Sequence, residues 1–153
     1  MDPMGASASP SPSPSPTLRG AWIRAAFLFG IVYLAAGLLF GQLAGAAASD
    51  QLRSAWRLMA WLVSAIAYAL HIRYEYVRLH NASVTAARHV AIGVAMGAFG
   101  LALAANIHAM TAGSTHRRAL GLSLVLWPLL TAIPAFVVAL AAIAILTRTR
   151  SAQ

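Results

Sequence analysis

Four long uncharged stretches alternate with short polar segments along this chain. The stretches cover residues 25–49, 58–70, 90–107 and 119–147. A membrane-spanning helix needs about 20 mostly apolar residues, because the hydrocarbon core of a bilayer is about 30 Å thick. The pattern therefore predicts an all-α integral membrane four-helix bundle. The predicted domain covers residues 20–149, with spans at about 22–46, 55–76, 87–109 and 119–147.

The second stretch is short for a span, so whether it crosses the membrane depends on the residues at its two ends. Arg53 and Arg57 can keep their alkyl stems in the apolar layer while their charges reach one interface, and Arg73 can do the same at the other. Tryptophan and tyrosine residues stand near both ends, as in the aromatic belts of membrane proteins. We expect this helix to continue to about Leu79 and residues 81–83 to form the next turn.

The fourth stretch is longer than a span requires. As one straight helix it would measure more than about 40 Å at 1.5 Å per residue. Pro128 and Pro134 lie inside it, and a proline removes a backbone donor and clashes with the preceding turn. We therefore expect a kink at these prolines, or a strong tilt, to fit the helix into the bilayer.

Residues 1–19 have a different character from the rest of the chain. Serine and proline alternate from Ser9 to Pro16. Proline at every second position prevents an α-helix and favours polyproline II, so we expect a disordered N-terminal tail. The tail could bind a proline-recognition module or be phosphorylated, but we favour a soluble leader without such a role.

The first apolar stretch also has features of a cleaved signal peptide. Arg19 and Arg24 would form its basic region, residues 25–40 its apolar region, and the alanines at 46–48 its cleavage site. The apolar region is slightly long for a signal peptide, and a Ser-Pro leader in front of one is unusual. We therefore prefer a retained first span, whereas cleavage would leave three spans.

Composition agrees with a chain embedded in lipid. Hydrophobic residues make up 60% of it and charged residues only 9%, whereas a soluble domain carries roughly 25% charged residues. The net charge of +8 comes from arginines that stand singly or in pairs at the edges of the apolar stretches. This placement indicates anionic lipid headgroups as partners and argues against nucleic acid. The absence of cysteine excludes disulfides and thiolate metal sites within the chain.

The placement of the arginines also predicts an orientation. With four spans, both chain ends and the connection between the second and third helices share one side. That side would hold Arg19, Arg24, Arg73, Arg78, Arg88, Arg148 and Arg150, and the other side Arg53, Arg57, Arg117 and Arg118. The positive-inside rule then places both termini in the cytoplasm.

Glycines recur at helical spacing in two of the predicted spans. The series are Gly37, Gly41 and Gly45 in the first span, and Gly93 and Gly97 in the third. Residues four apart share a helix face, and a face without side chains lets two backbones approach closely in lipid. We expect the first and third helices to pack through these faces, although the same faces could hold a second copy or another membrane protein.

The most polar stretch near the membrane follows the second span. His71, Glu75 and Arg78 are three or four positions apart and therefore share one helix face. The next helix returns Arg88 and His89 to the same side of the membrane. We expect these five side chains to form a polar cluster at the cytoplasmic mouth.

Four interpretations of this polar cluster stay open. Glu75 could carry a proton, the arginines could bind an anionic headgroup, or His71 and His89 could ligate haem iron or another metal from two helices. The interpretation that we favour is a helix end whose charges pair with one another and with lipid. No metal or cofactor is therefore predicted, and haem is the alternative.

The remaining polar residues carry no recognisable chemistry. Asn106, His108 and His116 lie toward the opposite side, but the two histidines flank a loop and lack a metal-site spacing. The predicted spans contain no acid or base near their centres, and no nucleophile–base pair, phosphate-binding loop or metalloprotease motif is present. The chain therefore does not resemble an enzyme.

The function predicted from these features is that of a non-enzymatic accessory or scaffold subunit. It would pack as a homo-oligomer or within a larger membrane complex, through its glycine faces. One alternative is a small transporter or channel subunit, gated by Glu75 and by the kink at Pro128 and Pro134. Another is a membrane haem-binding electron-transfer protein that uses His71 and His89.

Overall fold

The computed structural model describes residues 16–112 and 117–151, and almost all of them are helical. The elements are α1 (Pro16–Gly45), α2 (Asp50–Arg73), the short π-helix η1 (Tyr74–Arg78), α3 (Ser83–Thr111) and α4 (Arg117–Ser151). No strand occurs in these two segments. The predicted all-α class with four long helices is therefore confirmed.

All four helices are long and apolar enough to cross a membrane, by length and composition. The candidate spans are Gly20–Gly45, Asp50–Arg78, Ser83–Thr111 and Ala119–Thr149. Many large apolar side chains point outward, with Trp61 76% and Leu122 69% exposed. A soluble protein rarely exposes so much contiguous apolar surface, whereas lipid covers it without cost.

The ends of the first two helices follow local rules. Helix α1 begins at Pro16, so the end of the segment that we expected to be disordered is helical; proline is well tolerated in a first turn because its missing donor is unused there. The remainder of the predicted tail lies outside the described residues. Ser49 caps α2 by accepting a 3.2 Å hydrogen bond from the backbone amide of Leu52.

Helix α4 runs through both prolines without interruption. The hydroxyl of Thr131 lies between them and donates to the carbonyl oxygens of Trp127 and Pro128, each at 3.0 Å. A hydroxyl bonded back to the preceding turn is fully satisfied within its own helix. Thr131 therefore needs no hydrogen-bond partner outside this apolar helix.

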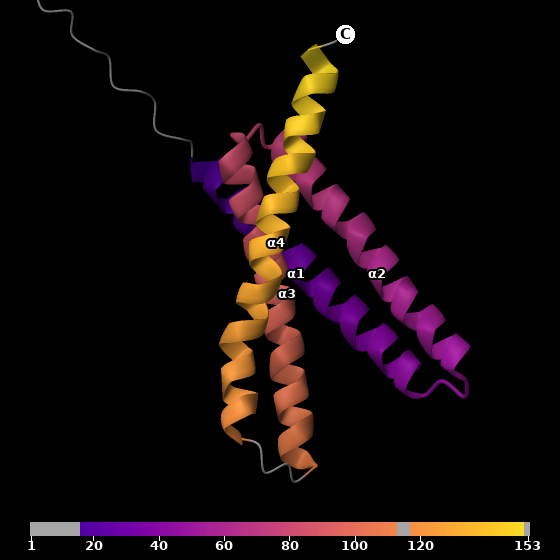
Figure 1. Cartoon of the computed structure of the whole chain (residues 1–153). Helices are drawn as coiled ribbons and strands as arrows, with labels where there is room; N and C mark the ends of the chain where they lie inside the picture. Colours follow the sequence, from indigo (N-terminus) through magenta and orange to yellow (C-terminus); the bar gives the residue numbers. More distant parts are fainter. Residues whose placement is uncertain (1–15, 113–116, 152–153) are drawn as a thin grey trace, which may run out of the picture.

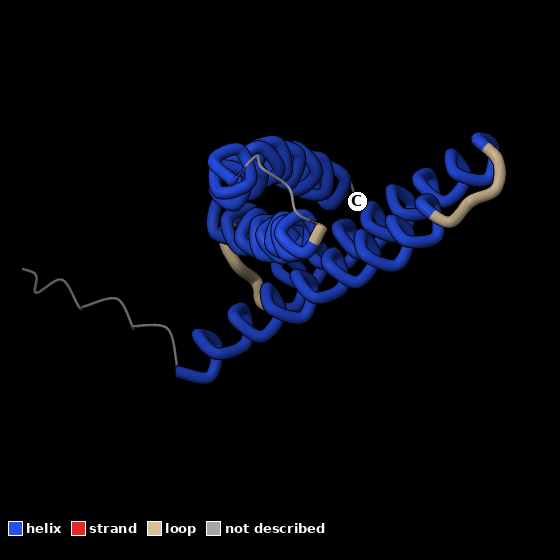
Figure 2. The backbone as a smooth tube through the Cα atoms, turned by 90° about the horizontal axis from the view of Figure 1, so that it is seen from below, coloured by secondary structure: helices blue, strands red, loops and turns tan. Residues whose placement is uncertain are grey.

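The helices form two antiparallel hairpins, α1–α2 and α3–α4. Helix α1 packs against both α2 and α3, and α3 packs along α4. Figure 1 shows the hairpins together at the end where α2 leads into α3 and apart at their other ends, and the view from below in Figure 2 shows the same separation. The structure is therefore an open bundle, joined mainly through α1 and α3.

The apolar core lies at the joined end. It contains fully or almost fully buried side chains from α2, α3 and α4, namely Ile72, Ala86, Ala87, Val90, Ala139 and Ile143. Nearer the separated end, Asn106 of α3 donates a 3.0 Å hydrogen bond to the hydroxyl of Ser123 on α4. This bond ties the two helices of the second hairpin together where apolar packing is thinner.

Glycines bring α1 and α3 into close contact. A Cβ atom added to Gly97 would lie 2.7 Å from Cβ of Tyr33 and 3.0 Å from the carbonyl oxygen of Gly30, and one added to Gly37 would lie 2.7 Å from Leu101. At Gly41 and Gly45 an added Cβ would meet nothing within 4 Å. The two helices separate beyond Gly37, so the far end of the predicted glycine face does not take part.

Candidate functional site

Glu75 lies in η1, and its side chain is completely buried. Its Oε2 atom accepts a 2.7 Å hydrogen bond from the side-chain amide of Asn81 and a 2.8 Å hydrogen bond from Nδ1 of His89. His89 comes from α3, and its side chain is 14% exposed. A carboxylate is therefore held between two helices, away from water, by an imidazole and an amide.

The local backbone brings these groups together. In η1 the amide of Leu79 bonds to the carbonyl of Tyr74, five residues back, and the amide of Asn81 bonds to the carbonyl of Glu75. His80 then adopts a left-handed conformation with φ of 52°, which ends the helix and turns the chain. The Asn81 side chain is thus returned to the carboxylate one turn behind it.

His71 is also completely buried, one turn before Glu75 on α2. Its ring stacks on Phe29 of α1, with ring centroids 4.2 Å apart and planes 11° apart. The ring also lies against α3, where a Cβ on Gly93 would lie 2.7 Å from Cε1 of His71. The imidazole is therefore enclosed by three helices, and glycine at position 93 leaves the room that it needs.

His89 has a matching aromatic contact. Its ring stacks on Trp22 of α1, with centroids 4.2 Å apart and planes 8° apart. The stack holds the ring in the orientation that presents Nδ1 to Glu75. Each histidine of the predicted cluster is thus positioned by an aromatic side chain from α1.

Several polar atoms of this region are buried without a hydrogen-bond partner. They are both ring nitrogens of His71, the Oε1 atom of Glu75 and the hydroxyl of Tyr33. A buried polar atom of this kind costs about 1–3 kcal/mol, and such atoms are rare in native proteins. Three of these four atoms belong to Glu75 and to His71, which stands one turn before it.

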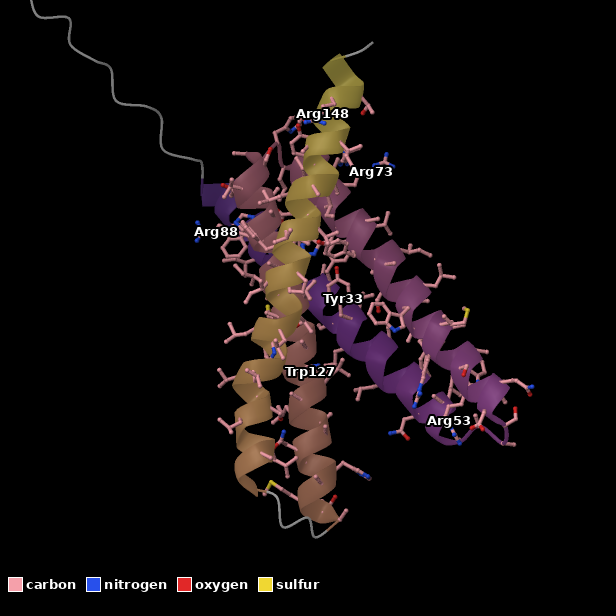
Figure 3. All side chains as sticks on the ribbon, viewed as in Figure 1. Tyr33, Arg53, Arg73, Arg88, Trp127 and Arg148 are labelled. Carbon is pink, nitrogen blue, oxygen red and sulfur yellow. The ribbon has the colours of Figure 1, made fainter. Side chains whose placement is uncertain are left out.

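The predicted arginines lie outside this group. Arg78 and Arg88 are exposed, and the ion pairs observed within the described segments are Arg53–Asp50 and His89–Glu75. Arg88 and His89 are adjacent on α3 and therefore point about 100° apart, so only one of them can face Glu75. Figure 3 shows Arg73, Arg88 and Arg148 toward the joined end and Arg53 at the far end of the first hairpin.

The surroundings of His71 and His89 leave little room for a metal ion. His71 and His89 do lie on neighbouring helices, but one ring is enclosed by Phe29 and Gly93 and the other is bonded to Glu75. Among the described residues, no group of three or more histidine, aspartate, glutamate or cysteine side chains could hold a metal ion. On the opposite side, His108 is exposed, and His116 lies outside the described residues.

A cleft separates the two hairpins beyond this buried group. It has a volume of about 660 Å³ and is lined by all four helices. Tyr33 and Tyr68 stand in its wall, and Trp61 and Trp127 face it from α2 and α4. The hydroxyl of Tyr68 donates to the backbone carbonyl of Ala135 on α4, which links the two hairpins beside the cleft.

The sequence pattern missed four members of this region. The pattern places Asn81 only in a turn, and Trp22, Phe29 and Tyr33 only within the first predicted span. For Asn81 a local signal existed, because an asparagine just after a helix can reach back to the last turn. The aromatic residues gave no such signal, since their contacts depend on how α1 rotates against α2 and α3.

Chemically, the arrangement can bind and release a proton. A carboxylate bonded to an imidazole can hold the proton on either partner, and a second imidazole beside it offers another acceptor and donor. Comparison with models of protein families, with curated proteins and with solved structures gives no match.

Proposed function

We propose that this chain is a small membrane transporter or channel subunit that moves protons through the buried group of Glu75, His89 and His71. The observation that carries the proposal is the fully buried Glu75 carboxylate bonded to His89. The unpartnered atoms of Glu75 and His71 support it, because a proton carrier must offer free donor or acceptor positions.

Energetics favours a functional origin for this buried group. A buried ion pair seldom stabilises a protein more than apolar residues of the same size would, because both charges lose their hydration. Ionisable residues inside membrane spans are therefore rare and commonly mark proton or ion pathways. Packing alone would be served here by apolar side chains, such as the isoleucine and valine residues of the neighbouring apolar core.

Proton flux into liposomes tests the proposal. The purified chain is reconstituted into liposomes that enclose a pH-sensitive dye. A potassium gradient with valinomycin then drives protons into the liposomes. We expect wild-type flux well above that of empty liposomes, and a fall of about 100-fold or more in E75Q, as for other groups that transfer protons. H89Q should lower the flux as well.

The matched control is H108Q, which changes an exposed histidine on the same helix as His89. Its flux should equal that of the wild type. Flux in E75Q that matches the wild type, with both proteins folded by circular dichroism, would refute proton movement through Glu75.

The cleft favours a second candidate function, that of an accessory subunit. An apolar cleft open between two hairpins could receive a transmembrane helix of a larger complex or of a second copy. Purification in mild detergent tests this candidate. Recovery of the chain only as a monomer, without co-purifying membrane proteins, would count against it.

We further propose the orientation in which both termini are cytoplasmic, which the bias of arginine toward that side supports. Because the chain has no cysteine, single cysteines can report the sidedness of each connection. S49C between α1 and α2 should react with a membrane-impermeant maleimide added outside intact cells, whereas A82C between η1 and α3 should react only after lysis. The reverse result would invert the orientation.

A further inference from the structure

The outer end of the first hairpin has a hollow that combines positive charge with an apolar lining. The hollow has a volume of about 410 Å³ and lies between α1 and α2. Arg53 and Arg57 line it from α2, four positions apart and therefore on the same face of that helix. Figure 3 shows Arg53 at this end of the hairpin, far from Arg73 at the other end of α2. The two arginines therefore stand near the start of a candidate span, at the level of one membrane face.

The charges of these two arginines are only partly balanced by the chain itself. Arg53 pairs with Asp50, whose Oδ1 atom lies 2.7 Å from one guanidinium nitrogen. For Arg57, no ion pair is observed in the described part of the chain. A guanidinium binds a phosphate through two parallel hydrogen bonds, and Arg57 has its donors available for such a group. The hollow therefore has a surplus of positive charge at its membrane face.

The rest of the hollow is apolar and roomy. Gly41 and Gly45 line it from α1, and a Cβ atom added to either would meet nothing within 4 Å. Phe40 and Trp61 also line it. Such a surface offers no hydrogen bond to a polar molecule, whereas a hydrocarbon chain can lie against it. The hollow thus has a charged part and a part suited to hydrocarbon.

The apolar part continues into the cleft between the hairpins. Gly37, Ala60 and Trp61 line both the hollow and the cleft. On α2 the cleft lining extends to Tyr68, which follows Arg57 by 11 positions. At 1.5 Å per residue this interval measures about 17 Å, and one leaflet is about 15 Å deep, as half of a hydrocarbon core of about 30 Å. From the arginines to Tyr68, the two hollows together therefore have the depth of one lipid leaflet.

We propose that this groove binds one anionic phospholipid, with its phosphate on Arg53 and Arg57 and an acyl chain in the cleft. Basic pockets between transmembrane helices hold anionic head groups in the same way. The combination of charge and apolar depth favours a lipid, because a soluble anion would not use the apolar part and an apolar helix would not use the arginines. The inference does not depend on proton movement, since Glu75 lies beyond the other end of α2.

Quenching of tryptophan fluorescence by brominated lipids tests the site, because bromine quenches indole rings that it contacts. The chain is reconstituted in phosphatidylcholine nanodiscs that contain increasing fractions of brominated phosphatidylglycerol or of brominated phosphatidylcholine with the same acyl chains. The difference between the wild type and W61F gives the quenching of Trp61, which lines both hollows. We expect half-maximal quenching of Trp61 at an about tenfold lower fraction of the anionic lipid, as two arginines near a membrane surface should provide.

Variants of the arginines test the head-group contact. R53Q/R57Q should abolish the preference, so that both lipids quench Trp61 equally, whereas R53K/R57K conserves the charges and should retain most of it. The matched control R73Q/R78Q removes two exposed arginines from the other end of the same span and should leave the preference unchanged. Equal quenching by both lipids in the wild type, or a preference that persists in R53Q/R57Q, would overturn the proposal.

The variant A60F tests the acyl-chain contact, because Ala60 lines both hollows. A phenylalanine there should exclude the chain from the cleft and remove most of the preference although both arginines are intact. A69F places the same bulk on an exposed position of the same helix and should retain the preference. An unchanged preference in A60F would refute the placement of the chain. Shielding of Trp61 from both lipids in the wild type would mean that another protein helix fills the cleft, which would also overturn the proposal.

Discussion

At the scale of single residues, Gly93 controls the position of His71. An added Cβ would lie 2.7 Å from Cε1 of His71 and 3.2 Å from the carbonyl oxygen of Ala26. Real Cβ atoms do not approach other atoms so closely, so the imidazole or the helix would have to move. The ring cannot move freely, because Phe29 stacks on one of its faces.

We therefore expect G93A to destabilise the protein by about 1–3 kcal/mol, as other substitutions that overfill a packed core do. Thermal unfolding in detergent, followed by circular dichroism, measures the change. G41A is the matched control, since its Cβ meets nothing within 4 Å; it should be neutral or slightly stabilising, because alanine is the better helix former. Equal losses in both variants would contradict the close contact.

Residue spacing predicted part of the polar site. The four-residue interval between His71 and Glu75 placed them on one face, and the returning helix brought His89 near them. Spacing within a helix cannot tell how far that helix rotates against its neighbours. For that reason the spacing includes Arg78 and Arg88, which are exposed, and omits Trp22 and Phe29, which stack on the two histidines.

At the scale of elements, the four helices could be read from the apolar stretches, but their ends could not. The π-helix η1 contains Glu75, whose bond to His89 comes from the next long helix, and a local pattern does not contain that contact. Helix α1 starts at Pro16, at the end of the Ser-Pro alternation, and the residue pattern there does not define its first residue. Boundaries such as these are set by a few competing hydrogen bonds, whereas a span is set by about 20 apolar residues.

The end of η1 allows a prediction at His80. Its φ of 52° is costly for a residue with a side chain and costs glycine nothing. H80G should therefore raise stability by at most about 1 kcal/mol, seen as a higher melting temperature, because the backbone cost that it relieves is partly offset by the greater freedom of glycine in the unfolded chain. A82G, at a position with φ of −56°, should lower the melting temperature. A lower melting temperature in H80G would mean that the contacts of the His80 ring stabilise the protein by more than its backbone conformation costs.

At the scale of the whole molecule, the two hairpins are joined along α1 and α3 and open toward the ends of α2 and α4 that lie farthest from η1 (Figure 1). The glycines predicted the α1–α3 contact. The cleft could not be predicted, because it depends on the angle at which two hairpins meet, and apolar spans pack acceptably at more than one angle.

The hydrogen bond from Tyr68 to Ala135 bridges the hairpins beside the cleft, so its loss should let them separate. In Y68F we expect a broader and longer distance distribution between spin labels at S54C and L122C, measured by electron–electron resonance in nanodiscs. A hydrogen bond in lipid contributes only about 0.6 kcal/mol on average, so the protein should remain folded. Labels at Q42C and S54C, within one hairpin, should show no change.

The pairing of Glu75 with His89 also bears on how the chain enters the membrane during synthesis. A lone acidic side chain costs roughly 3 kcal/mol at the centre of a membrane helix and less near its end, where Glu75 lies. Glu75 and His89 stand on consecutive helices joined by a turn of a few residues, so they can meet as soon as α3 leaves the ribosome. Helices α2 and α3 are thus suited to leave the insertion machinery as a pair, with the charge neutralised before lipid surrounds it.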